Sequence, residues 1–354
     1  MTTENIKHNL DIQFPKDLPD TNLVEMELAH ISINGLCFLP IKVPFHYDCS
    51  ISTKILDEEE NKLGEILYLQ KQPSMEVTGM IEVQYSCLLL EIETEEISES
   101  HYQFKYDYLI IEKEFLNLYL THYKLKSPIW GGFFHIDELP NTEFNKIISL
   151  NEIIANKDIS LINNYKEILE QIVLESNPFS RYLRLYHLLE LQFDMHTAYL
   201  IKKMLEDGGK EKEISDTLRD YAREDIERLK SIFKTKVDKT KLDPYLSKLL
   251  DHRETAKKIF YYKEKESNPF RSVEKFEKLF TRTSINQANF DAAFGSTSYD
   301  KKILATIAYW IYTVRNCIAH NKLGEYVIGK NDEDFVVEFA EPLIREIVKQ
   351  CYKE

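Results

Sequence analysis

The chain lacks the cysteine patterns that mark disulfide-rich and zinc-binding proteins. It has five cysteines in 354 residues, an odd number, and none of them forms a CxxC pair. Widely scattered cysteines favour neither a disulfide framework nor a tetrahedral zinc site. We therefore expect reduced thiols, as in a cytoplasmic protein, with no metal or other cofactor. The cysteines are Cys37, Cys49, Cys87, Cys317 and Cys351.

Signals for export, membrane insertion and several enzyme classes are also missing. Residues 1–14 contain no apolar stretch behind a basic start, so we expect no secretory signal. The longest strongly apolar run, residues 303–314, is shorter than the roughly 20 residues of a membrane span and predicts a buried helix. The chain has no glycine-rich phosphate loop, no GxSxG and no HExxH motif, so ATP-driven, hydrolase-elbow and zinc-protease functions have no support. We expect a cytoplasmic protein without membrane contact.

Arginine is absent from the first 140 residues. This stretch has 24 Asp and Glu and 10 Lys, a balance of −14 that equals the net charge of the whole chain, so residues 141–354 hold 35 acidic and 35 basic residues. The first of the ten arginines is Arg181. Because a guanidinium matches phosphate oxygens, any RNA site is expected in this second part. The length suits two domains, which we place at residues 1–140 and 141–354.

Residues 1–140 are expected to form a β-rich domain. Short β-favouring runs recur, as in residues 81–85 and 104–108, whereas helix-length apolar periodicity is scarce. The acidic run at residues 57–60 marks one of the loops. With helices expected after residue 141, the fold class is α+β.

Residues 141–354 carry clear helix start and stop signals. Asn177 and Pro178 supply an N-cap and an N1 proline for a long helix that extends to Glu206. The apolar residues of this helix lie on nearly all of its faces, which predicts a central position in a bundle. Further helices are expected at residues 211–236, 244–262, 298–322 and 342–354. Two β-favouring runs flank a turn and predict a small C-terminal hairpin, at residues 325–328 and 335–339.

The helix expected at residues 298–322 ends with an unusual set of polar residues. Three apolar turns are followed by Arg315 and Asn316, and His320 comes four residues after Asn316. At about 100° per residue, Asn316 and His320 lie roughly 40° apart on one face, whereas Arg315 lies about 140° from His320. Burying an unpaired guanidinium or amide is unfavourable, so these residues must meet solvent, a partner chain or a ligand.

These side chains fit the chemistry of RNA cleavage without a metal. Histidine transfers protons near neutral pH, arginine stabilises charge on a phosphate, and asparagine orients either group by hydrogen bonding. One chain supplies only one Arg and one His here. A twofold homodimer that brings two such helices together would double the set around one phosphate.

The segment 314–322 resembles the signature of the HEPN domains (higher eukaryotes and prokaryotes nucleotide-binding), in which Arg, a polar residue and three further residues precede His. Arg315, Asn316 and His320 match it position by position, and the stretch 181–190 is also similar to a helix of the family. The resemblance covers roughly residues 150–354. It implies a helical bundle, a composite active site at a dimer interface, and a metal-independent endoribonuclease in which these three residues are catalytic.

The resemblance also bears on the biological role. Toxin–antitoxin members of the family carry a nucleotide-modified Tyr two residues after the His, whereas this chain has Lys322, so that subtype is not expected. A β-rich domain before a HEPN domain is similar to the ApeA-like architecture of antiviral defence, in which infection triggers RNA cleavage and growth arrest. Because a negative surface repels RNA, the acidic N-terminal domain would bind a protein trigger or restrain the nuclease.

Other candidates and rival interpretations remain open at this point. His187 is a second candidate for catalysis, and the weak candidates for RNA binding are Arg181, Arg184 and Lys322. Cations near the end of a helix also suit its terminal carbonyl groups, so Arg315 and His320 could be capping residues of a non-catalytic HEPN module for dimerisation or protein interaction. A nucleotide-binding sensor is a third alternative.

Overall fold

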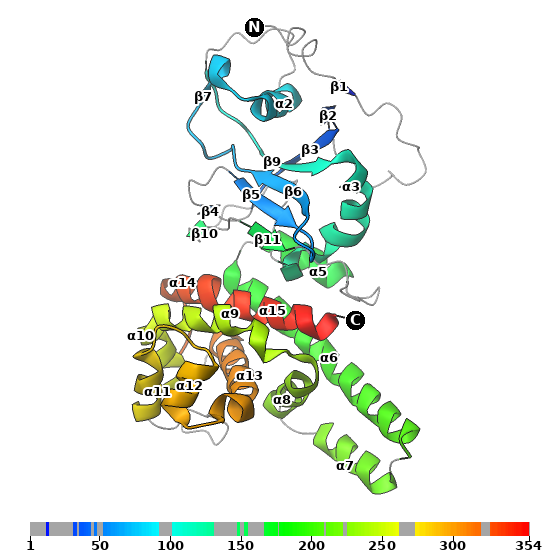
Figure 1. Ribbon diagram of the computed structural model, residues 1–354, viewed down its shortest axis with the longest axis vertical. Helices are drawn as coiled ribbons and strands as arrows, with labels where there is room; N and C mark the ends of the chain where they lie inside the picture. Colours follow the sequence, from blue (N-terminus) through cyan, green and yellow to red (C-terminus); the bar gives the residue numbers. More distant parts are fainter. Residues whose placement is uncertain are drawn as a thin grey trace. The chain divides into compact units, whose positions relative to one another are not determined.

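The chain divides into two compact units, which are described separately (Figure 1). The first comprises residues 1–158 and 163–176, and the second comprises residues 159–162 and 177–354. The division falls near residue 176, later in the chain than the predicted boundary at residue 140. The computed structural model describes residues 12–13, 31–33, 35–43, 46–47, 52–91, 101–130, 147–148, 152–154, 166–175, 177–208, 210–221, 225–261, 273–319 and 326–353.

A twisted sheet forms the centre of the first unit. Its four longest strands pair antiparallel in the order β3 (Leu36–Ile41), β9 (Asp107–Glu112), β6 (Lys62–Leu67) and β5 (Ser52–Leu56). The short strands β2 (Ile31–Ile33) and β1 (Ile12–Gln13) extend the β3 edge, and β11 (Glu152–Ile154) pairs parallel to β5. Two small additional pairs join β4 (His46–Tyr47) to β10 (Ile147–Ile148) and β7 (Met75–Glu76) to β8 (His101–Tyr102).

Helical segments cover both faces of this sheet. Leu39 and Leu109 belong to a core shared with Leu116 and Tyr119, whereas Phe38 belongs to a separate core. Neighbouring residues of a strand point to opposite faces, so a strand covered on both sides reads as a continuous apolar run. The first core contains α3 (Lys113–Leu118) and the turn η2 (Tyr119–Tyr123), and the second contains α2 (Glu82–Glu91).

Gly64 allows two strands of this sheet to approach closely. A Cβ atom at this position would lie 2.7 Å from the Ile110 carbonyl oxygen of β9 and 2.9 Å from Cγ1 of Ile111. Glycine therefore permits the β6–β9 pairing at a point where any side chain would collide with backbone.

The strand expected at residues 81–85 does not form. Residues 82–85 are instead the first turn of helix α2. The Gln84 side chain accepts a hydrogen bond from the Ile81 backbone N–H at 3.0 Å, which satisfies a donor at the helix start. At the other end, the buried Glu91 carboxylate accepts hydrogen bonds from the Tyr108 hydroxyl at 2.6 Å and from the Lys105 backbone N–H at 2.8 Å. These contacts hold α2 against the sheet and override the local β-preference.

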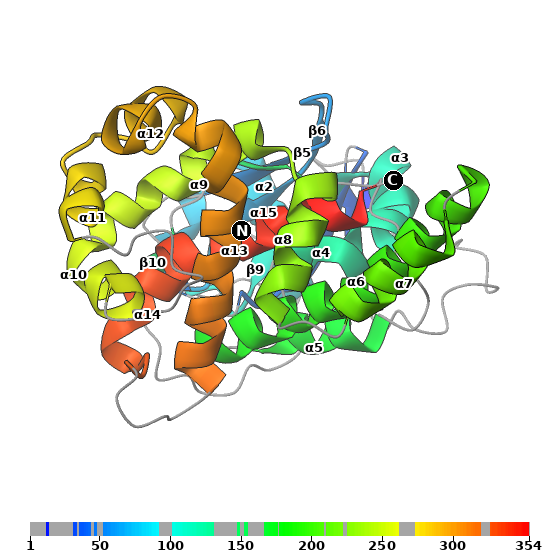
Figure 2. The same cartoon turned by 90° about the horizontal axis from the view of Figure 1, so that it is seen from below.

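The second unit is built around the long helix α6 (Pro178–Glu206). Asn177 caps its start, accepting hydrogen bonds from the backbone N–H groups of Phe179 at 2.9 Å and Ser180 at 3.3 Å, as the sequence predicted. α6 packs against α8 (Asp225–Lys236), α13 (Ser298–Ala319) and α15 (Glu341–Tyr352). Figure 2 shows α6, α8 and α13 side by side. The predicted central position holds for residues 178–196 of α6, whereas no residue from 197 to 206 is buried.

Two of the predicted helices differ in detail. Residues 211–236 form two helices, α7 (Glu211–Tyr221) and α8, instead of one. Residues 243–261 are helical: η6 (Lys248–His252) joins α9 (Asp243–Ser247) to α10 (Arg253–Ala256), and η7 (Lys257–Tyr261) follows α10. Two further helices are α11 (Val273–Phe280) and α12 (Gln287–Phe294).

The predicted C-terminal hairpin is also wrong. Residues 326–329 have no regular structure, and residues 330–340 form η8 (Lys330–Asp332), α14 (Glu333–Phe335) and η9 (Val336–Ala340). Phe335 and Phe339 lie one turn apart, and their rings contact the aromatic cluster around Phe260 and Trp310. In a helix, residues four apart lie on the same face, so both rings reach this aromatic core. The segment is therefore helical and forms no strand. The α+β class itself is confirmed by the sheet of the first unit and the helices of the second.

Candidate functional site

The motif residues Arg315 and Asn316 lie near the end of α13, a helix buried over most of its length. Tyr182 of α6 donates a hydrogen bond from its hydroxyl to the Ile311 carbonyl at 3.0 Å, which ties α13 to α6 one turn before the motif. Asn316 is 7% exposed, whereas the Arg315 side chain is 24% exposed. The guanidinium therefore reaches solvent from an otherwise enclosed helix.

Three neighbours orient the Arg315 guanidinium. It donates a hydrogen bond from Nη1 to Oδ1 of Asn316 at 3.1 Å, and its Nη2 lies 3.7 Å from Oε1 of Glu190. Its central carbon lies 5.5 Å from the centre of the Tyr186 ring, within the range of a cation–π contact. Glu190 and Tyr186 both belong to α6, so the site combines two helices.

Tyr186 brings an unsatisfied hydroxyl to this cluster. The residue is 1% exposed, and its hydroxyl has no hydrogen-bond partner among the residues that the structure describes. Burial raises the pKa of Tyr186, and the carboxylates of Asp225 and Glu190 raise it further, while Arg315 opposes them. The phenol therefore stays protonated at neutral pH.

Glu190 also contacts His187. Nδ1 of His187 lies 3.2 Å from the second carboxylate oxygen of Glu190, and the His187 side chain is 54% exposed. The structure thus gathers Arg315 and the second catalytic candidate His187 on the two oxygens of one carboxylate. Sequence reasoning assigned no role to Glu190 or Tyr186. The available signal was their spacing on α6, because residues 186, 187 and 190 lie on neighbouring turns.

Two of the predicted site residues cannot be placed. His320 and Lys322 lie outside the described residues, since α13 is described up to Ala319 and the chain is described again from Tyr326. The described segments before and after these two residues contact each other. The Ile328 backbone N–H donates a hydrogen bond to the Cys317 carbonyl of α13 at 3.1 Å. The shared face of Asn316 and His320 stays a prediction.

The predicted contact of Arg181 with RNA needs correction. Its side chain is 3% exposed, and it donates hydrogen bonds from Nε and Nη2 to the two carboxylate oxygens of Glu341 at 3.1 and 3.0 Å. Burial lowers the pKa of the nearby Arg345, and Glu341 raises it. Arg181 is therefore part of a buried charge network between α6 and α15. Arg184 is half-buried on α6, and its role stays a prediction.

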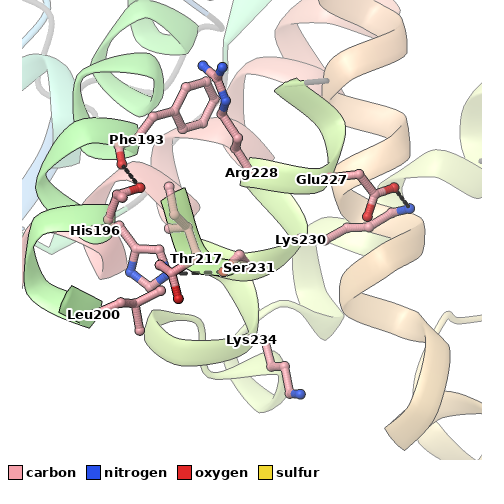
Figure 3. Close-up of a pocket in the computed structure, with 11 residues that line it drawn as sticks. Phe193, His196, Leu200, Thr217, Glu227, Arg228, Lys230, Ser231 and Lys234 are labelled. Carbon is pink, nitrogen blue, oxygen red and sulfur yellow. Dashed lines mark hydrogen bonds and ion pairs between the residues drawn. The ribbon is translucent and has the colours of Figure 1, made fainter. Parts of the chain in front are cut away.

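A cavity of about 320 Å³ lies further along α6, between α6, α7 and α8 (Figure 3). On the α6 side it is lined by His196 and Leu200, which face Ser231 of α8. His196 is 4% exposed, and its Nε2 forms a hydrogen bond with the Ser231 hydroxyl at 3.1 Å. Burial lowers the pKa of His196, and Lys236 lowers it further, so the ring is neutral at physiological pH.

Comparisons with known proteins do not extend this description. No protein-family model, no curated protein and no solved structure matches the chain. Among the described helices, none combines the length and apolar character of a membrane span. The described His, Cys, Asp and Glu side chains form no group of three or more suited to a metal ion. The similarity to HEPN domains therefore rests on the two sequence stretches 181–190 and 314–322.

Proposed function

We propose that this protein is a metal-independent endoribonuclease of the HEPN type. In this proposal Arg315 binds and stabilises the scissile phosphate, Asn316 orients the reacting groups, and His320 acts as general acid or base. The 2′-hydroxyl of the RNA loses a proton and attacks the adjacent phosphorus, and the leaving 5′-oxygen gains a proton.

The observation that carries the proposal is the arrangement around the Arg315 guanidinium. A partly exposed ion pair such as Arg315–Glu190 contributes only about 0–1 kcal/mol, so a phosphate can replace the carboxylate at little cost. Arginine–phosphate hydrogen bonds are charge-assisted and often bidentate, which favours the exchange. Asn316 and Tyr186 hold the guanidinium in place before RNA arrives.

The proposed active form is a homodimer. Cleavage requires one group to remove a proton and another to deliver one, whereas the motif supplies a single histidine per chain. A twofold axis beside α13 would place two copies of Arg315 and His320 around one phosphate.

The first unit is assigned a regulatory role in defence. Its excess of acidic residues and its lack of arginine disfavour RNA binding. We assign it the binding of a protein trigger or the restraint of the nuclease, so that activation in the cytoplasm leads to RNA cleavage and growth arrest.

The alternative function is a non-catalytic interaction module. One observation favours it: Glu190 already pairs with Arg315 within the same chain, as expected for a cation whose role is to join two helices. The two functions differ in what they require of Arg315. A joining role needs only the contact with α6, whereas catalysis needs the guanidinium at the phosphate.

Cleavage of RNA by purified protein in EDTA separates these functions. We expect Arg315→Ala to slow cleavage at least about 100-fold, the effect of removing one group that stabilises developing charge. Arg253→Ala is the matched control, because Arg253 is 51% exposed and pairs with Glu277 away from the motif. Equal cleavage by Arg315→Ala and Arg253→Ala, with both variants folded, would favour the interaction module.

A further inference from the structure

The cavity between α6, α7 and α8 has a lining suited to a small polar ring. Hydroxyl groups are supplied by Thr197, Thr217 and Ser231, and apolar surface by Phe193 and Leu200. A volume of about 320 Å³ lies at the lower end of the range for pockets that bind small molecules. Such a lining offers hydrogen bonds to ring edges and apolar contact to ring faces.

One buried nitrogen at this cavity has no partner. Nδ1 of His196 has no hydrogen-bond partner among the residues that the structure describes, although the residue is 4% exposed. Its other nitrogen is already bonded to Ser231. A buried polar atom without a partner is unfavourable, so a water molecule or a ligand atom is expected to satisfy it.

The side chains around the cavity favour an anion. The lining includes three cations, Arg228, Lys230 and Lys234; Lys230 pairs with Glu227 of the lining at 2.7 Å, and Arg228 pairs with Asp225 at 3.7 Å. The Arg228 guanidinium lies 5.5 Å from the centre of the Phe193 ring. Stacked arginine and aromatic side chains are the surfaces on which single-stranded RNA bases are held.

The cavity and the Arg315 site share helix α6. On α6, Phe193 follows Glu190 by three residues and His196 follows it by six, which corresponds to about 4.5 and 9 Å along the helix. On α8, Asp225 acts electrostatically on Tyr186, and Arg228 lies one turn further. Because stacked nucleotides are about 3.4 Å apart, about one to three nucleotides span this separation.

We propose that this cavity binds an unstacked nucleobase of the RNA substrate, adjacent to the phosphate held by Arg315. This inference rests on the proposed ribonuclease function and adds to it a source of base preference. The base would stack beside Phe193 and Arg228, and its polar edge would meet His196 and Ser231. Arg228 and Lys234 would then lie close to the RNA backbone.

Filling the cavity tests the inference. Leu200→Trp introduces a larger side chain into it, and Leu205→Trp is the matched control, because Leu205 lies on the same helix, is 63% exposed and is not part of the lining. Both variants and the wild type are compared by thermal unfolding, by sequencing of the RNA ends that they produce, and by binding of the four nucleoside 5′-monophosphates in equilibrium dialysis.

We expect the wild type and Leu205→Trp to prefer one base beside the cleaved bond and to bind its monophosphate most tightly. Leu200→Trp should lose this preference and bind at least about tenfold more weakly. If Leu200→Trp does not fold, Ser231→Ala provides the same test with an expected threefold to tenfold loss, the range for one hydrogen bond.

The outcomes separate the cavity from the nuclease. RNA cleavage with the same base preference in Leu200→Trp and Leu205→Trp would overturn the cavity inference and leave the nuclease intact. Selective monophosphate binding that Leu200→Trp abolishes, in a protein that cleaves no RNA, would retain the cavity and overturn the nuclease. Equal monophosphate binding by wild type and Leu200→Trp would also overturn the cavity inference.

Discussion

Glu190 has two opposing effects on Arg315. Its carboxylate holds the guanidinium in position, and it also competes with a phosphate for the same N–H groups. It fixes the exposed ring of His187 as well. If the protein is the proposed nuclease, Glu190 is expected to lower the affinity for RNA and to raise the rate of cleavage of the bound RNA.

Glu190→Gln should therefore lower both KM and kcat, which means tighter binding of RNA but slower cleavage. We expect KM for RNA to fall up to about fivefold, because competition by a partly exposed ion pair is removed. We expect kcat to fall at least about tenfold, because Arg315 and His187 lose a charged partner that orients them. Glu206→Gln serves as the control, since Glu206 pairs with Lys202 on the exposed end of α6. A higher KM with unchanged kcat would contradict this role.

Arg181 is a buried cation, so its predicted role is in stability and not in RNA binding. The side chains of Arg181 and Glu341 are 3% and 4% exposed, so removal of either one leaves the other charge in a poorly solvated place. Arg181→Ala should lower the free energy of unfolding by about 3–5 kcal/mol in urea denaturation. Replacing both partners, with Arg181→Met and Glu341→Leu, should restore only part of that loss, because the buried Arg345 also loses the carboxylate of Glu341.

The control for this prediction is Lys202→Ala. Lys202 and Glu206 form an exposed pair one helical turn apart, for which the expected change is below about 0.5 kcal/mol. A similar small change in Arg181→Ala would show that Arg181 is not held in the buried network.

At the level of elements, the β6–β9 pairing depends on Gly64. Gly64→Ala places a Cβ atom 2.7 Å from a backbone oxygen, so the strands must separate. We expect a loss of about 1–3 kcal/mol in the free energy of unfolding. Gly79→Ala is the control, because its Cβ would meet no atom within 4 Å, and its expected change is within about 1 kcal/mol. Equal stability of the two variants would contradict the described register.

Helix ends were predictable from the sequence because their signals are local. Asn177 and Pro178 begin α6 as expected, since capping and N1 proline depend only on adjacent residues. The runs 81–85 and 335–339 gave the wrong element, because aromatic and β-branched residues also fill the interior of helices. Only the cores around α2 and Trp310 decide their conformation, and those cores are formed by residues distant in sequence.

The candidate site was predictable in part for the same reason. Arg315 and Asn316 share one short motif, so their association was visible in the sequence. Glu190 and Tyr186 lie about 125 residues earlier and reach Arg315 only through the packing of α6 on α13. Exposure of Arg181 could not be predicted either, because its partner Glu341 is 160 residues away.

At the scale of the whole molecule, the charge is distributed unequally between the two parts of the chain. The arginines and the proposed active site belong to the second unit, and the acidic excess belongs to residues 1–140. This division agrees with a catalytic unit controlled by a unit that avoids RNA. The proposed function further predicts that the active species is a dimer, with two copies of the motif at one phosphate.

The cleavage rate of RNA by His320→Ala in EDTA tests the central claim most directly. General acid–base catalysis contributes about 100-fold to 10,000-fold, so the single-turnover rate constant should fall by that factor relative to wild type. His122→Ala should cleave at the wild-type rate, because His122 is exposed on the first unit. Wild-type cleavage by a folded His320→Ala protein, or no metal-independent cleavage by the wild type, would contradict the account.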